Sequence, residues 1–170
     1  LIYAATGTLS LNAMFGHGYP DTQYKFLVVG ALFFLIGLTV KLSLVPFHLW
    51  SPDAYEGAAT PITAFMATAV KAAVILLLIR VLAEARYLTT DIWRPALTYL
   101  AISTVLIGNI MALVQSSIKR MLAYSSISHA GVMLAGLVVL NEIGTRAVVF
   151  YGITYVFMTL VSFYITSIVQ

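Results

Sequence analysis

The hydrophobic positions of this chain gather into long apolar runs that short polar links separate. A transmembrane helix needs about 20 mostly apolar residues. The runs that reach this length predict spans at residues 26–50, 61–83, 95–118, 121–141 and 147–170. The earlier stretch "LIYAATGTLSLNAMF" is too short to cross a bilayer and resembles the end of another helix. Because the links are short, successive spans are expected to lie antiparallel in one bundle.

The predicted fold class is therefore all-α: a polytopic transmembrane helix bundle, one domain over residues 1–170, with one discontinuous helix. The interruption is expected within the first span, where Pro46 lies five residues after Lys41. Proline removes a backbone hydrogen bond, and non-helical backbone at membrane depth persists only beside protein or a water-filled cavity. A proline kink without function is the alternative, and His48 beside it would then only bond freed backbone groups.

The composition indicates that the bilayer is the solvent of this chain. Hydrophobic residues make up 61% and charged residues 9%, against about 25% charged residues in a soluble domain. The net charge of +3 comes from few residues, so no nucleic-acid partner is expected. The chain has no cysteine, which excludes thiolate-bound zinc and iron–sulfur clusters. We expect an integral membrane protein that binds no cofactor or metal itself and is part of a longer chain.

Three titratable side chains are predicted to lie near the middle of the membrane. Lys41 lies 15 residues before Glu56, in the turn between the first two spans, and Lys71 lies 15 residues after it. At about 1.5 Å per helical residue, both lysines are roughly 20 Å from that turn. His129 lies ten residues after Lys119, also near mid-depth.

Lysines at this depth point to a proton path. A lysine at the centre of a membrane helix costs about 2.5–3.5 kcal/mol and normally marks an ion path or a pairing partner. A buried lysine held between desolvation and a nearby carboxylate can gain and lose a proton near neutral pH. We therefore interpret Lys41, Lys71 and His129 as a proton relay. The supporting candidates near the break or beside the relay are Pro46, His48, Thr68, Ser126 and Ser128.

A structural role for the same residues stays open. Either lysine can form a salt bridge to Asp53, to Glu56 or to a residue outside this chain. His129 can be a hydrogen-bonding residue between helices. The tyrosines are interpreted mostly as packing residues or interface anchors.

Two stretches carry a family resemblance. "KLSLVPFHLWSPDAYEGAATPITAFMATAVKAA" (41–73) and "GNIMALVQSSIKRMLAYSSISHAG" (108–131) resemble signature blocks of the antiporter-like membrane subunits of type-I NADH–quinone oxidoreductase. Within that family the chain is most similar to the subunit N branch. The stretch "YAATGTL" near the start also fits.

The resemblance implies a subunit of about fourteen helices, of which this chain holds the end of the sixth and the seventh to eleventh. It implies that Lys41 lies at the break of the seventh helix, that Lys71 is the central lysine of the eighth, and that His129 belongs to the polar axis. The glutamate partner of Lys41 and an ionisable residue of the twelfth helix would lie outside this chain.

The implied function is proton translocation coupled to electron transfer elsewhere in a hetero-oligomeric complex. NADH, flavin, iron–sulfur clusters and quinone would be bound by other subunits. The partners would be other membrane subunits and the lipid bilayer, in a bacterial inner membrane or an organelle inner membrane. The mechanism we expect is electrostatic: separating Lys41 from its glutamate would perturb Lys71, since two unit charges about 10 Å apart interact by about 1.7 kcal/mol at an effective dielectric constant of 20.

Other functions remain in competition with this one. The chain can belong to a sodium/proton antiporter subunit of a multisubunit cation antiporter, or to a membrane subunit of an energy-converting hydrogenase. It can also be a non-transporting scaffold, or a small-solute transporter with a site at the broken helix.

Overall fold

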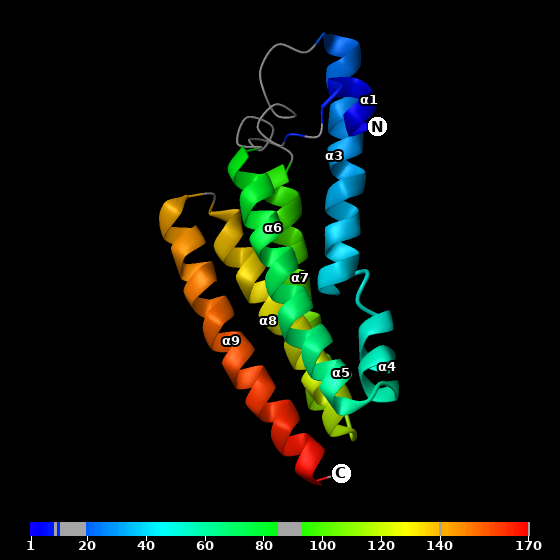
Figure 1. Ribbon diagram of the computed structural model, residues 1–170, viewed down its shortest axis with the longest axis vertical. Coiled ribbons are helices and arrows are strands. Elements are labelled where there is room, and N and C mark those ends of the chain that lie inside the picture. Colours follow the sequence, from blue (N-terminus) through cyan, green and yellow to red (C-terminus); the bar gives the residue numbers. More distant parts are fainter. Residues whose placement is uncertain (9, 11–19, 85–92, 140, 170) are drawn as a thin grey trace.

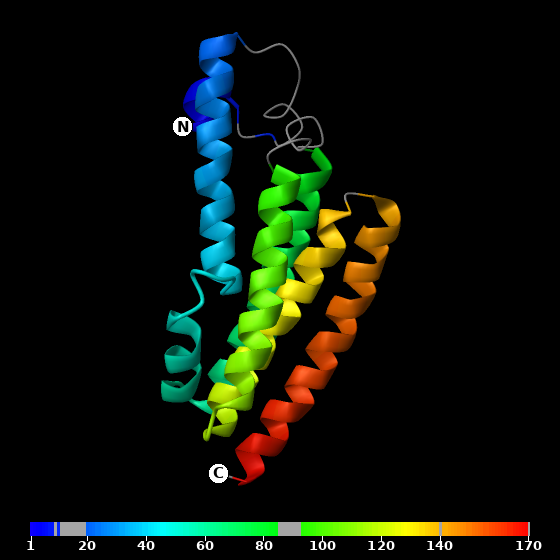
Figure 2. The same cartoon turned by 180° about the vertical axis from the view of Figure 1, so that it is seen from behind.

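The computed structural model describes residues 1–8, 10, 20–84, 93–139 and 141–169. All the regular secondary structure in these residues is helical. The elements are α1 (Ile2–Thr6), α3 (Asp21–Leu42), α4 (Trp50–Gly57), α5 (Thr60–Phe65), the π-helical segment η1 (Met66–Val70), α6 (Lys71–Glu84), α7 (Trp93–Leu113), α8 (Ile118–Val138) and α9 (Glu142–Val169). The long helices run side by side in an elongated bundle (Figures 1 and 2).

Within the described residues, five helical stretches are long and apolar enough to cross a membrane. They are Asp21–Leu42, Thr60–Glu84, Arg94–Leu113, Ile118–Val138 and Glu142–Val169. The predicted class, an all-α polytopic membrane bundle, is confirmed. The outer surface agrees with a lipid environment, because large apolar side chains such as Phe33, Phe150 and Leu106 are more than half exposed.

The break predicted in the first span is present. Helix α3 ends at Leu42, and Ser43 takes a left-handed conformation with φ 58° and ψ 41°. The backbone N–H of Val45 then donates to Oγ1 of Thr104 on α7 at 3.1 Å. Figure 1 shows α3 ending about halfway along the bundle, with α4 continuing alongside the lower half. The irregular backbone is therefore held by protein, as non-helical backbone within a membrane bundle requires.

Two features of the fold were not expected from the sequence. Residues taken as a link after the first span form α4, which buries Ser51, Pro52 and Tyr55. The span after it is not a uniform α-helix, because η1 inserts one wide π turn between α5 and α6. Such turns occur frequently at functional sites.

Among the described residues, α7 and α8 make the most extensive contact between two helices, and glycines lie at this contact. A Cβ atom added to Gly108 of α7 would lie 2.8 Å from the backbone nitrogen of Ser128 on α8. One added to Gly131 of α8 would lie 3.0 Å from the backbone nitrogen of Val105 on α7. Small residues of this kind let membrane helices approach closely. The pair fixes the position of α8, whose middle carries Ser126, Ser128 and His129.

Candidate functional site

Lys71 is enclosed by the bundle. It is the first residue of α6, directly after η1, and only 1% of it is exposed. Its Nζ atom donates to Ser126 of α8 twice, to the hydroxyl at 2.6 Å and to the carbonyl oxygen at 2.9 Å. Both acceptors are neutral, and no ion pair to Lys71 is present in the described part of the chain.

A tyrosine extends this hydrogen-bond network to a third helix. The hydroxyl of Tyr155 on α9 lies 2.7 Å from Oγ of Ser126. It also donates to the carbonyl oxygen of Ala67 in η1 at 2.8 Å. The wide turn thus has one of its carbonyl groups bonded to a side chain, four residues before Lys71. Helices α6, α8 and α9 are therefore tied together through one buried polar chain.

His129 lies beside this hydrogen-bond network. It follows Ser126 by three residues on α8, so both side chains lie on one face of that helix. Its Nδ1 atom is 2.6 Å from the hydroxyl of Tyr151 on α9. Its ring centroid is 5.2 Å from that of Tyr155. The structure brings Lys71, Ser126 and His129 together, although the hydrogen bonds at His129 and those at Lys71 form two separate sets among the described residues.

Lys41 lies apart from this network. It is in the last turn of α3 and is exposed on the surface of the described chain. None of the hydrogen bonds or ion pairs among the described residues includes its ammonium group. Pro46 is also exposed, whereas His48 is buried and its Nδ1 finds no hydrogen-bond partner among the described residues. The described contacts therefore connect Lys71 to one predicted supporting residue, Ser126, and leave Lys41 at the edge.

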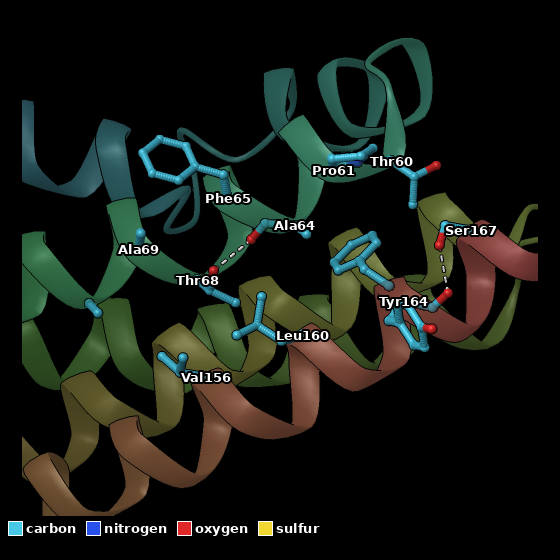
Figure 3. Close-up of a pocket in the computed structure, with 12 residues that line it drawn as sticks. Thr60, Pro61, Ala64, Phe65, Thr68, Ala69, Val156, Leu160, Tyr164 and Ser167 are labelled. Carbon is cyan, nitrogen blue, oxygen red and sulfur yellow. Dashed lines mark hydrogen bonds between the residues drawn. The ribbon is translucent and has the colours of Figure 1, made fainter.

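The two remaining supporting residues differ in their surroundings. Ser128 is buried where α8 meets Gly108 of α7. Thr68 donates its hydroxyl to the carbonyl of Ala64 at 2.6 Å, within its own helical segment. Thr68 also lines an apolar groove of about 570 Å³ between the α5–α6 region and α9 (Figure 3). The groove approaches the lysine site from the side, since Ala72 is in its wall.

The carboxylates considered as partners of the lysines bind an arginine instead. Arg120, at the start of α8, contacts Asp53 at 2.6 Å and Glu56 at 3.0 Å. Hydrogen bonding to Arg120 lowers the pKa of the exposed Glu56 carboxyl. Among the described contacts, the proposed salt bridge from Lys41 or Lys71 to these carboxylates is absent.

Sequence reasoning missed the tyrosines of the site. Tyr151 and Tyr155 are four residues apart on α9, so they share one helix face. Tyr55 of α4 also reaches Ser126. The available signal was weak: two tyrosines at helical spacing in an uncharged helix are equally typical of packing.

The whole chain, residues 1–170, matches the family described as "NADH:quinone oxidoreductase/Mrp antiporter, TM". A bundle of membrane helices fits that description, and the chain belongs to this family. It is 43% identical to NADH-quinone oxidoreductase subunit N of Desulforamulus reducens over 170 residues, which is all of this chain and 36% of that protein. It is 41% identical to NADH-quinone oxidoreductase subunit N 2 of Aquifex aeolicus, covering 99% of this chain and 34% of the relative. The chain thus spans about a third of the length of the curated relatives it matches.

Solved structures give the same class. A chain of respiratory complex I from Thermus thermophilus with bound aureothin is similar with a TM-score of 0.74 and 42% identity, over 97% of this chain and 34% of that one. A chain of the Mrp complex from Dietzia sp. DQ12-45-1b is similar with a TM-score of 0.85 and 26% identity, over 96% and 30%.

Proposed function

We propose that this chain is part of a subunit that moves protons across an energy-transducing membrane within an NADH–quinone oxidoreductase. The observation that carries the proposal is Lys71, a lysine buried inside a membrane bundle whose partners among the described residues are neutral groups. A buried lysine without a counter-ion is expensive to maintain, so it is retained for a role that needs its proton. The relatives named subunit N support the choice of complex.

In this proposal Lys71 is the central station of the relay, with Ser126 beside it and His129 one helical turn further along α8. Lys41 acts from the end of α3, where the chain is broken and its side chain is free to meet a carboxylate outside this chain. A change in that pairing alters the electrostatic energy of the Lys71 ammonium group by about 1.7 kcal/mol if the charges are about 10 Å apart in a medium of dielectric constant 20. This energy is larger than that of a shift of one pKa unit.

The same proposal assigns the redox chemistry to other subunits. NADH, flavin, iron–sulfur clusters and quinone are bound elsewhere in the complex. This chain contributes proton transfer, and its partners are the neighbouring membrane subunits of a hetero-oligomer in a bacterial or organelle inner membrane.

The test is proton uptake by inverted membrane vesicles energised with NADH, in which the full-length subunit carries Lys71→Ala. Quinone reduction and assembly of the complex are measured in the same vesicles. Lys25→Ala is the matched control, because Lys25 is an exposed lysine near the start of α3. We expect Lys71→Ala to lose most of its proton uptake per electron in assembled complex and Lys25→Ala to retain it. Normal uptake by Lys71→Ala would refute the relay.

A second candidate is a sodium/proton antiporter subunit, favoured by the structural similarity to the Mrp complex chain. The same vesicles separate the two. Sodium-driven proton exchange without any NADH-driven uptake would select the antiporter.

A further inference from the structure

The hydrogen bonds around Tyr155 have a defined direction. A tyrosine hydroxyl carries one proton, and that of Tyr155 is donated to the carbonyl oxygen of Ala67, which can only accept. In the 2.7 Å contact between the two hydroxyls, Ser126 must therefore be the donor and Tyr155 the acceptor. The single proton of the Ser126 hydroxyl is thus directed away from Lys71.

The direction of this hydrogen bond determines whether the Ser126 hydroxyl is a donor or an acceptor toward Lys71. With its proton committed to Tyr155, the Ser126 hydroxyl presents a lone pair to the Nζ atom at 2.6 Å, and the Ser126 carbonyl oxygen presents another at 2.9 Å. An ammonium group has three donors and no acceptor, so it matches two acceptors well. A neutral amine has a lone pair of its own, and the Ser126 hydroxyl in this orientation gives that lone pair no donor.

From this geometry we infer that Tyr155 is a positioning residue: it holds the Ser126 hydroxyl as an acceptor and so stabilises the protonated form of Lys71 without a carboxylate. The fixed end of the chain is the Ala67 carbonyl in the wide turn η1. A proton cannot leave through that carbonyl. This row of hydrogen bonds therefore retains a proton at Lys71 and does not conduct it. Release requires the Ser126 hydroxyl to turn or the lysine to move.

Other titratable groups near this site do not replace the missing carboxylate. Among the described residues, Tyr55 of α4 reaches Ser126, and His129 of α8 and Tyr151 of α9 lie beside Tyr155. Helix α3, which packs against α6 through Leu38 and Leu42, contributes Lys41 in its last turn. None of these side chains is a carboxylate, so the stabilisation of the ammonium group comes from the orientation of neutral dipoles.

The inference rests on the proposed function, and its test is the pH profile of NADH-driven proton uptake per electron in vesicles with the full-length subunit. Tyr155→Phe keeps the ring and removes only the hydroxyl, so the Ser126 hydroxyl is released to donate to the neutral amine of Lys71. We expect the alkaline limit of proton uptake to move to lower pH by about one unit, which corresponds to about 1.4 kcal/mol. Tyr164→Phe, at an exposed tyrosine of the same helix, should leave the profile unchanged.

Two further variants keep the test decisive. Ser126→Ala removes the acceptor hydroxyl and should shift the alkaline limit of proton uptake in the same direction. This variant tests the inference even where Tyr155→Phe fails to assemble. Ser126→Thr keeps a hydroxyl and should restore the parent profile. A loss of uptake by the same factor at every pH would indicate a packing role and overturn the inference, as would an unshifted profile. If Lys71→Ala pumps normally, the proposed function fails; if Lys71→Ala is inactive while Tyr155→Phe matches Tyr164→Phe, only the role of Tyr155 fails.

Discussion

Two basic side chains of this protein, Lys71 and Arg120, are each bound by groups from another helix. They differ in their position in the bundle, in their exposure and in the charge of their partners. Arg120 lies at one end of the bundle, partly exposed, with the carboxylates of Asp53 and Glu56 at 2.6 and 3.0 Å. Lys71 lies inside the bundle, and its partners are a hydroxyl and a carbonyl group of Ser126.

This difference in surroundings indicates a different role for each side chain. Exposed ion pairs contribute little to stability, and Arg120 links α4 to α8 through pairs of this kind. A buried charge is no evidence for stability, because its desolvation often exceeds the attraction it gains. The Arg120 cluster therefore joins α4 to α8, whereas the proposed function assigns Lys71 to proton transfer.

The strongest test of this contrast replaces each cation by methionine, which is unbranched and apolar. We expect Lys71→Met to remove most of the proton uptake per electron, because a positioned proton-transfer group is lost. Its effect on the melting temperature of the solubilised complex should be small or positive, because a buried charge is removed.

Arg120→Met should give the opposite pattern: unchanged protons per electron and a slightly lower melting temperature. If both variants lose proton uptake in parallel with stability, the two regions do not differ in role.

The close packing around the lysine site gives the next largest effect. We expect Gly108→Ala to destabilise the subunit by about 1–3 kcal/mol, because the new Cβ would meet the backbone of Ser128 at 2.8 Å. Moving α8 displaces Ser126, so proton uptake should fall as well. The measurements are the melting temperature and the proton uptake of the same preparation.

Gly37→Ala is the control, since a Cβ at this exposed position of α3 meets nothing within 4 Å. It should be neutral or stabilising by about 0.5–1 kcal/mol. Equal losses for the two alanines would show that packing between α7 and α8 is not the cause.

The sequence predicted the helices and the break well, because both depend on local properties. Apolar length specifies the spans, and Pro46 marks the interruption after Lys41. Helix α4 was missed because its sequence, "WSPDAYEG", has little apolar character; it is held by tertiary packing, in which the ring of Tyr55 meets that of Phe163 on α9 edge to face at 6.5 Å.

The candidate site was predicted in part. Lys71 was selected from its charge and depth and Ser126 as a supporting hydroxyl beside the relay, and the structure joins them directly. The roles of Tyr155 and Arg120 were not foreseen, because they depend on how α8 and α9 are rotated about their axes. Depth counted along the chain placed Lys41 and Lys71 together, but it carries no information about which side chain faces the interior.

The anchor of the break should lose stability on the same scale as the packing of the lysine site. Thr104→Val leaves the Val45 N–H without its 3.1 Å acceptor, which costs about 1–3 kcal/mol for a buried donor. We expect a lower melting temperature, with recovery in Thr104→Ser because the hydroxyl returns. Thr98→Val on the same helix is the control, since its exposed hydroxyl bonds only the carbonyl of Arg94; a similar loss there would remove the role assigned to Thr104.

The smallest effect is expected at the Arg120 cluster, and it depends on pH. Arg120 lowers the pKa of Glu56 in the folded chain, so the stabilisation is present above the carboxyl's usual pKa of about 4.3 and is lost as the pH falls through the lowered value. We expect Glu56→Gln to reduce the melting temperature slightly at neutral pH and to converge with the parent at acidic pH. Glu142→Gln is the control, because Glu142 pairs only with Arg146 one turn along its own helix and links no two elements. A constant difference between Glu56→Gln and the parent at every pH would mean that packing, and not the ionised carboxylate, joins α4 to α8.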